Sequence, residues 1–254
     1  MKTGLLVLAI ALAANAGAEP SAPATLAATE TAIERAGLRA DADALAQAVR
    51  PLDAALAREP DNAALLYTRA FGHYAATAPL RAAKERGAMR VQLEQAVALL
   101  QRVKDPRWAA EAAALHGGIL GQLIDLEGGV SGMTLGPKSR RLLEQAARTA
   151  PASPRVLLFR GIAQLNTPPI WGGDPAEGAE LLQQAVDRFE AGAQPAGAPR
   201  WGHAEALAWL GIARRRAGDT GRARTAWERA LVLDPDYRWV RLALLPSLAK
   251  NRGQ

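Results

Sequence analysis

Residues 206–235 decide the fold, and they read A-L-A-W-L-G-I-A-R-R-R-A-G-D-T-G-R-A-R-T-A-W-E-R-A-L-V-L-D-P. Apolar and small residues recur with helical spacing on two successive segments, at Leu207, Leu210, Gly211, Ala223, Trp227 and Ala230. Gly218 and Asp219 predict a turn between the segments, and Pro235 predicts the end of the second one. Because small side chains let two helices approach closely, this stretch predicts a helical hairpin.

Related segments recur along the chain. Five of them, such as Q-L-E-Q-A and L-L-E-Q-A, close on alanines 55, 96, 146, 185 and 230, which are 41, 50, 39 and 45 residues apart. This loose period predicts a repeat of helix pairs. We expect the second helices over 41–58, 84–103, 137–149, 175–191 and 220–233, and the first over 22–36, 62–76, 107–126, 154–165 and 201–217. Residues 236–250 predict a capping helix, since a stack otherwise exposes an apolar face.

The final hairpin resembles a tetratricopeptide repeat (TPR), a helix-turn-helix unit that stacks into a superhelix. It matches the TPR pattern at Leu207, Leu210, Gly211, Ala223, Trp227, Ala230 and Pro235. It departs from the pattern at Arg214, where the family usually has an aromatic residue. The resemblance covers the chain from about Asp41 and implies an all-α superhelical stack of about five units over 41–235, with the C-terminal capping helix at 236–250.

In such a stack the first helices line the concave side. The resemblance implies that the last unit presents Glu205, Ala208, Ile212 and Arg215 there. The chain is also similar to an uncharacterised group of exported bacterial TPR proteins, through the pair of loops described below. That similarity implies the fold and no activity.

The first residues predict a secretory signal peptide. Lys2 precedes an apolar run over 5–14, which is too short to span a membrane, and 16–18 has the small-x-small pattern of a cleavage site. An uncleaved N-terminal anchor is the alternative. The chain has no cysteine, so no lipid-modified cysteine and no disulfide is expected. We therefore expect residues 1–18 to be removed and 19–254 to form a periplasmic or secreted helical repeat domain.

The formal net charge of +6 is compatible with nucleic acid or an anionic membrane as a partner. Export argues against nucleic acid, and an arginine-rich, solvated helix surface accounts for the charge. Residues 237–242 mix cationic and aromatic side chains, as helices at membrane interfaces do. A capping helix has the same composition, and we favour the cap, so no membrane contact is expected.

The stretch G-M-T-L-G-P-K-S over 132–139 resembles a phosphate-binding loop only superficially. Pro137 occupies the place of the last glycine and lacks the backbone N–H that a phosphate would need. Alignment of the repeats instead predicts that Pro137 starts a helix and that Ser139 packs where the last unit has Ala223. The sequence therefore predicts a loop before a helix, and no nucleotide site.

Three consecutive units are predicted to have long turns, over 77–83, 127–136 and 166–174. Such insertions fall on one edge of a stack and often mark a binding face. The second and third turns, which we expect to be neighbours, offer the candidate binding residues Met133, Leu135, Lys138, Asn166, Trp171 and Asp174. The alternative is that Trp171 and Met133 fill the gap between widened repeats.

Catalysis needs converging groups, and the sequence does not provide them. His73, His116 and His203 lie in three different predicted helices without the spacing of a metal pair, and there is no thiol. We therefore predict a protein that is not an enzyme, with no metal and no cofactor.

The leading prediction is a scaffold that binds a protein or peptide partner in its groove or along the loop edge. Arg215, within the run Arg214–Arg216, would favour an acidic group, although such a run also suits a solvated helix end. The alternative function is a small-molecule carrier that works with a membrane transport system, which predicts a closed apolar pocket.

Overall fold

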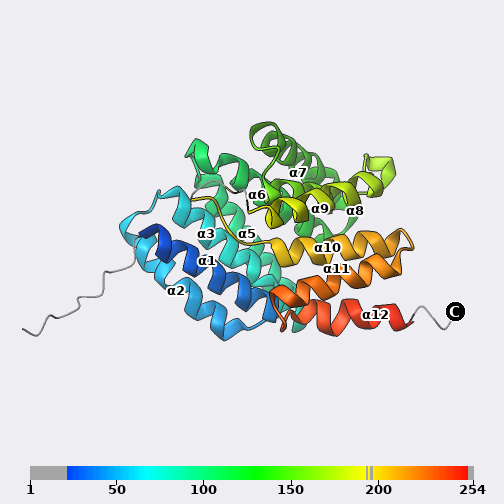
Figure 1. Cartoon of the computed structure of the whole chain (residues 1–254). Coiled ribbons are helices and arrows are strands. Elements are labelled where there is room, and N and C mark those ends of the chain that lie inside the picture. Colours follow the sequence, from blue (N-terminus) through cyan, green and yellow to red (C-terminus); the bar gives the residue numbers. More distant parts are fainter. Residues whose placement is uncertain (1–21, 193, 195–196, 251–254) are drawn as a thin grey trace, which may run out of the picture.

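The computed structural model describes residues 22–192, 194 and 197–250, and these residues form helices and turns without a strand (Figure 1). The predicted signal peptide over 1–18 lies outside the described residues. No described helix combines the length and the apolar character needed to cross a membrane. The helices are α1 (Ala22–Arg39), α2 (Ala42–Arg58), α3 (Ala63–Ala75), α4 (Thr77–Ala82), α5 (Arg86–Arg102), α6 (Pro106–Glu127), α7 (Gly129–Thr149), α8 (Pro154–Asn166), α9 (Pro175–Glu190), α10 (His203–Arg216), α11 (Thr220–Leu233) and α12 (Leu245–Lys250), with a 3₁₀ turn η1 (Pro169–Trp171) and a π-helical segment η2 (Val240–Leu244).

The helices pack as five antiparallel pairs, which are α1/α2, α3/α5, α6/α7, α8/α9 and α10/α11. The first helix of each pair also contacts the first helix of the next pair. The predicted all-α repeat of helix pairs is therefore confirmed. η2 and α12 pack on α11 as the predicted C-terminal cap, and bury Val240, Leu244 and Leu248.

Local sequence signals explain where the helices begin. The side chains of Asp41, Asn62, Asp105, Ser153 and Asp174 each accept a hydrogen bond from a backbone N–H in the first turn of the following helix. Proline occupies the first position of the last three of these helices, where its missing N–H is harmless.

The close approach of paired helices depends on glycine. A Cβ atom at Gly211 would lie 2.2 Å from Nε1 of Trp227, and that indole donates a hydrogen bond to the Ala208 carbonyl at 3.0 Å. In the third pair, Ser139 takes the position that Ala223 has in the last pair; it is buried, and its hydroxyl donates to the Gly117 carbonyl at 2.8 Å. Ser139 is thus a packing residue, as predicted.

The stretch from Gly132 to Lys138 is helical, so the prediction of a loop there is wrong. Gly128, at φ 90°, reverses the chain directly after α6, and α7 then packs along α6 from its first turn. Pro137 lies inside α7 instead of starting it. Glycine and proline are local signals against a helix, but contact with α6, which includes the half-buried Leu135, overrides them. The predicted turn over 77–83 similarly contains a short helix, α4.

Helix α1 binds the segments on both sides of the last helix pair, at Arg200, Gly202 and Asp234, so the stack closes on itself. Arg39, at the end of α1, forms an ion pair with Asp234 after α11 at 3.2 Å, and Figure 1 shows the end of α1 beside the C-terminal helices. Residues 200–202, directly before α10, bind α1 and place Trp201 in the core, stacked on Phe71 with 4.1 Å between ring centroids.

Closure removes the open groove that the resemblance implied for the last pair. Ala208 and Ile212, which we expected on a concave surface, are buried. Glu205 accepts a hydrogen bond from the Tyr74 hydroxyl of α3 at 2.5 Å. The concave side is therefore occupied by the protein's own side chains.

Candidate functional site

The candidate site is an exposed apolar edge formed by α7 and the loop after α8. Val130, Met133 and Pro137 follow one another at i, i+3 and i+7 on the exposed side of α7. Ile170 and Trp171 project from the loop. The exposed fractions are 83% for Val130, 69% for Met133, 87% for Ile170 and 60% for Trp171. These values contradict the alternative in which Met133 and Trp171 fill a gap between repeats.

The loop that presents Ile170 and Trp171 is held by its own backbone. The Trp171 N–H donates to the Pro168 carbonyl at 2.8 Å, and the Gly172 N–H donates to the Pro169 carbonyl at 2.9 Å. Gly172 has φ 84°, a conformation that other residues rarely adopt. Two prolines and this turn fix the backbone, so the two apolar side chains project from a frame that loses little entropy when a partner binds.

Arg140 joins the two parts of the edge. Its guanidinium donates to the Trp171 carbonyl, and it also lies beside Gly172, where an added Cβ would be 3.3 Å from Nη2. Met133 precedes Arg140 by two helical turns, about 10 Å along α7. The contact between the two elements lies at Arg140, directly after the predicted segment 132–139, and that segment is a helix. We call this surface the α7–loop edge, formed by Val130, Met133, Pro137, Arg140, Ile170 and Trp171.

Sequence reasoning missed Arg140, Val130 and Ile170. Nothing in the sequence distinguishes Arg140 from its neighbour Arg141, because the partner of Arg140 is a backbone carbonyl 31 residues away. Val130 and Ile170 are single apolar residues between turn signals, which an interior packing role would explain equally well.

Three other predicted binding residues have structural contacts near this edge. Asn166 accepts a hydrogen bond from Arg216 at 3.0 Å and donates to the Ile162 carbonyl at 2.9 Å. Asp174 is the N-cap of α9 and accepts from the Ala176 and Glu177 amides. Lys138 is half-buried, and its charge acts on His116. Burial, and secondarily Lys138, lowers the pKa of His116 to about 4.

Arg215 lies in another part of the molecule. It donates to the Ser247 hydroxyl of α12 at 2.6 Å and lies over the Trp227 ring. Arg214 donates to Gln183 of α9, and Arg216 donates to the Leu165 carbonyl as well as to Asn166. Each arginine of this run therefore binds a neighbouring element of the chain, and the run is not an open cationic cluster.

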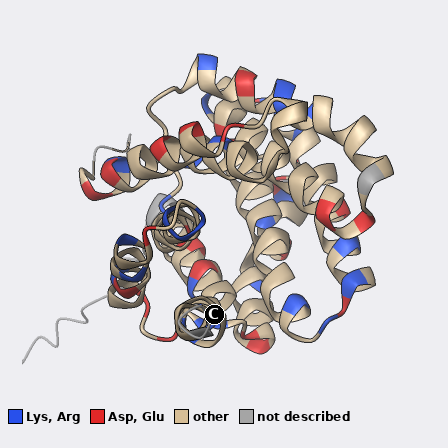
Figure 2. Ribbon diagram, turned by 90° about the vertical axis from the view of Figure 1, so that its right-hand side faces the viewer, with Lys and Arg blue, Asp and Glu red and all other residues tan. Residues whose placement is uncertain are grey.

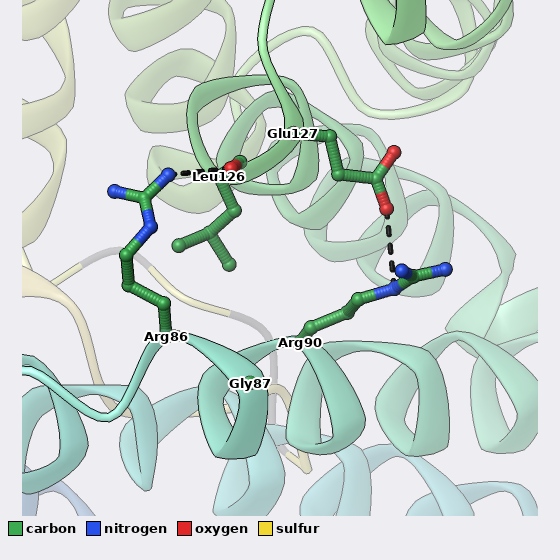
Figure 3. Close-up of a pocket in the computed structure, with 5 residues that line it drawn as sticks. All are labelled: Arg86, Gly87, Arg90, Leu126 and Glu127. Carbon is green, nitrogen blue, oxygen red and sulfur yellow. Dashed lines mark hydrogen bonds and ion pairs between the residues drawn. The ribbon is translucent and has the colours of Figure 1, made fainter.

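A shallow cleft lies between the start of α5 and the end of α6, at the junction of the second and third helix pairs (Figure 3). Arg86 donates to the Leu126 carbonyl, and Arg90 pairs with Glu127 at 3.2 Å and with Glu94 at 2.8 Å. Both guanidinium groups that line the cleft therefore have partners within the chain.

Figure 2 shows basic and acidic residues interspersed over the helices on the side drawn. His73, His116 and His203 lie in α3, α6 and α10, and the described residues contain no group of three His, Cys, Asp or Glu that could hold a metal ion. No protein-family model matches the chain, and comparison with curated proteins gives no significant similarity.

Proposed function

We propose that this chain is an exported TPR-like scaffold that binds a protein or peptide partner through the α7–loop edge. The observation that carries the proposal is the exposure of four large apolar side chains on two elements that are joined by Arg140. Several large apolar side chains exposed on one part of a folded domain mark an interaction site. The edge also contains tryptophan, methionine and arginine, which are residue types enriched at the centre of protein interfaces.

The TPR assignment is supported by the stacked helix pairs and by the packing inside the last pair. In that pair Gly211 packs against the buried Trp227, and the family pattern likewise places a small residue against a large one. The departures are the helical extension of α7 and the closure between the first and last pairs.

A protein partner fits the edge better than a membrane or a small molecule does. The exposed acids Asp174 and Glu127 lie near the exposed bases Arg140 and Arg141, so the edge mixes both signs of charge and lacks the basic cluster that an anionic bilayer attracts. The carrier function needs an internal apolar pocket, and the centre of the stack is filled by Trp201 and its aromatic neighbours. Localisation outside the cytoplasm, absence of catalysis and absence of a cofactor are parts of the same proposal and rest on the sequence.

The test is site-specific photo-crosslinking. A photoreactive phenylalanine analogue at position 171 should capture one protein from cell-envelope extract, and the same analogue at position 232 should not. Val232 is the control because it is also apolar and exposed, at 81% against 60% for Trp171, but lies on α11.

The captured protein is then purified and titrated against the wild type and variants. We expect Trp171→Ala and Met133→Ala each to weaken binding by about tenfold or more, as hot-spot residues do, while Val232→Ala leaves it unchanged. Equal crosslinking at both positions, or unchanged affinity in both edge variants, contradicts the proposal.

A further inference from the structure

The contact that closes the stack is built from carboxyl groups that hold a backbone segment. Glu30 and Glu34 lie one turn apart on α1. Glu30 accepts from the Arg200 N–H at 3.1 Å, and Glu34 accepts from the Gly202 N–H at 2.7 Å. The carbonyl of the residue between them, Trp201, accepts from a guanidinium, that of Arg155, at 3.2 Å. We call this contact between α1 and residues 200–202 the closure seam.

Acidic groups outnumber basic ones around the closure seam. The charged side chains that act on the two α1 carboxyls come from α1 itself, α6, α8 and α10, and they are Glu30, Glu34, Glu111, Arg155 and Glu205. Of these, Arg155 is the one cation, and it already forms a buried ion pair with Glu111 at 2.7 Å. Four ionised carboxylates against one guanidinium would leave a net charge of −3 in a buried contact.

Two tyrosines also face the α1 carboxyls, since Glu30 acts on Tyr67 and Glu34 acts on Tyr237, and burial raises the pKa of both hydroxyls well above 10. The Tyr74 hydroxyl donates to Glu205, and Thr68 donates to Glu30 at 3.2 Å. His203, next in the chain after the seam, lies 3.7 Å from Glu190 of α9. Burial is the main cause that lowers the pKa of His203, so its titration falls below the usual histidine range.

We propose that the closure seam is a pH-sensitive latch, in which loss of protons from Glu30 and Glu34 releases α1 from residues 200–202 and opens the concave side. The proposal concerns α1 and residues 200–202, none of which belongs to the α7–loop edge, and it does not depend on that edge. Release would uncover the aromatic surface around Trp201 that α3 and α8 contribute through Phe71 and Phe159.

The titration supports this geometry. Burial raises the pKa of Glu30 and of Glu34 from 4.5 to about 7 when the seam is closed. An open seam would return both groups to water and to their ordinary values. The closed form therefore holds protons that the open form releases, so closure weakens as pH rises from about 4.5 to about 7. The closing equilibrium falls by up to about 300-fold for each carboxyl over that range.

The experiment measures a distance across the seam. The chain has no cysteine, so spin labels attach only where cysteines are introduced. Arg35→Cys on α1 with Glu228→Cys on α11 spans the seam, and Arg35→Cys with Ala46→Cys lies within the first helix pair; all three positions are exposed. Distances are measured by double electron–electron resonance at pH 5 and pH 8.

In the wild-type background we expect one short distance across the seam at pH 5 and an added longer population at pH 8. Glu30→Gln with Glu34→Gln mimics the protonated groups and should keep the short distance at both values. Glu144→Gln, an exposed control, should behave as the wild type, and the pair within α1/α2 should not change.

An identical distance at pH 5 and pH 8 in the wild-type background overturns the proposal, as does an equal shift in the double glutamine variant. If that variant does not fold, carbon NMR of glutamate side chains in the wild type decides. Two carboxyls titrating near pH 7 support the latch, and titration of all carboxyls below about pH 5.5 overturns it.

Discussion

Trp171→Ala and Trp201→Ala are expected to differ in their effect on stability, because Trp171 lies on the α7–loop edge and Trp201 lies in the core. Trp201 is 1% exposed and stacks on Phe71, whereas Trp171 is 60% exposed. A tryptophan buries about 200 Å², and at about 25 cal/mol per Å² full burial contributes about 5 kcal/mol. Trp201→Ala should therefore lower the free energy of unfolding by about 4 kcal/mol.

The same estimate predicts a small loss in the free energy of unfolding for Trp171→Ala. The buried part of Trp171, about two fifths of its surface, corresponds to at most about 2 kcal/mol, and because a surface side chain keeps some of its contacts in a compact unfolded chain the expected loss is about 1 kcal/mol. Both variants are compared with the wild type by urea denaturation followed by far-UV circular dichroism, with the slope m checked for constancy.

Either of two results would contradict this reasoning. If Trp171→Ala costs as much as Trp201→Ala, Trp171 is a structural residue of the loop and the main support for a binding edge is lost. If Trp201→Ala costs less than about 1 kcal/mol, the closed arrangement around Trp201 does not contribute to the folded state in solution.

Three further predictions follow from the packing and the buried charges. Because the two α1 carboxyls of the closure seam bind protons more tightly when folded, the free energy of unfolding should fall between pH 5 and pH 7.5 by up to about 3 kcal/mol per group, and the double glutamine variant should lose this dependence in urea titrations at each pH. Gly211→Ala should lower the free energy of unfolding by more than about 2 kcal/mol in thermal or urea unfolding, since its Cβ would lie 2.2 Å from Trp227. Gly221→Ala, at an exposed position of α11, should be neutral or stabilising by up to about 1 kcal/mol. Arg155→Met should cost about 3–5 kcal/mol because it leaves the buried Glu111 without its partner, and a change below about 1 kcal/mol would show that the pair is not buried in solution.

The helix pairs could be predicted because their signals are local. N-capping residues such as Asp41, Asn62 and Asp174 and the apolar spacing of each helix depend on residues within a few turns. The first half of α7 could not be predicted in this way. Its glycines and Pro137 disfavour a helix locally, and the contact with α6 that overrides them is a tertiary interaction.

The candidate edge was predicted in part. The size of Met133 and Trp171 and their place between turn signals predict an exposed role, and both side chains are exposed. Asn166 and Asp174 have the same sequence context, but their side chains cap or join helices. Arg140 went unrecognised because its partner is a carbonyl distant in sequence, and sequence patterns carry no information about such contacts.

Closure of the stack could not be predicted from the sequence, because its contacts join residues that are far apart in the chain. Glu30 and Arg200 are 170 residues apart, and Arg39 and Asp234 are 195 apart. On α1 the two glutamates have the spacing of an ordinary solvated helix face. Only the three-dimensional arrangement shows that this face is buried against the segment before α10 and that its charges are uncompensated.

The two proposals, a binding edge and a closure latch, can be separated by one cross-test. A partner that binds the α7–loop edge contacts the third and fourth helix pairs, so fixing the seam with Glu30→Gln and Glu34→Gln should leave its affinity unchanged. A partner that instead occupies the concave side binds only molecules whose seam is open, so its apparent affinity is its intrinsic affinity multiplied by the open fraction. The double glutamine variant would then bind at least about tenfold more weakly at pH 8, while Trp171→Ala would bind normally. That pair of results would move the binding site from the edge to the concave side, and it would retain the latch as the device that controls access.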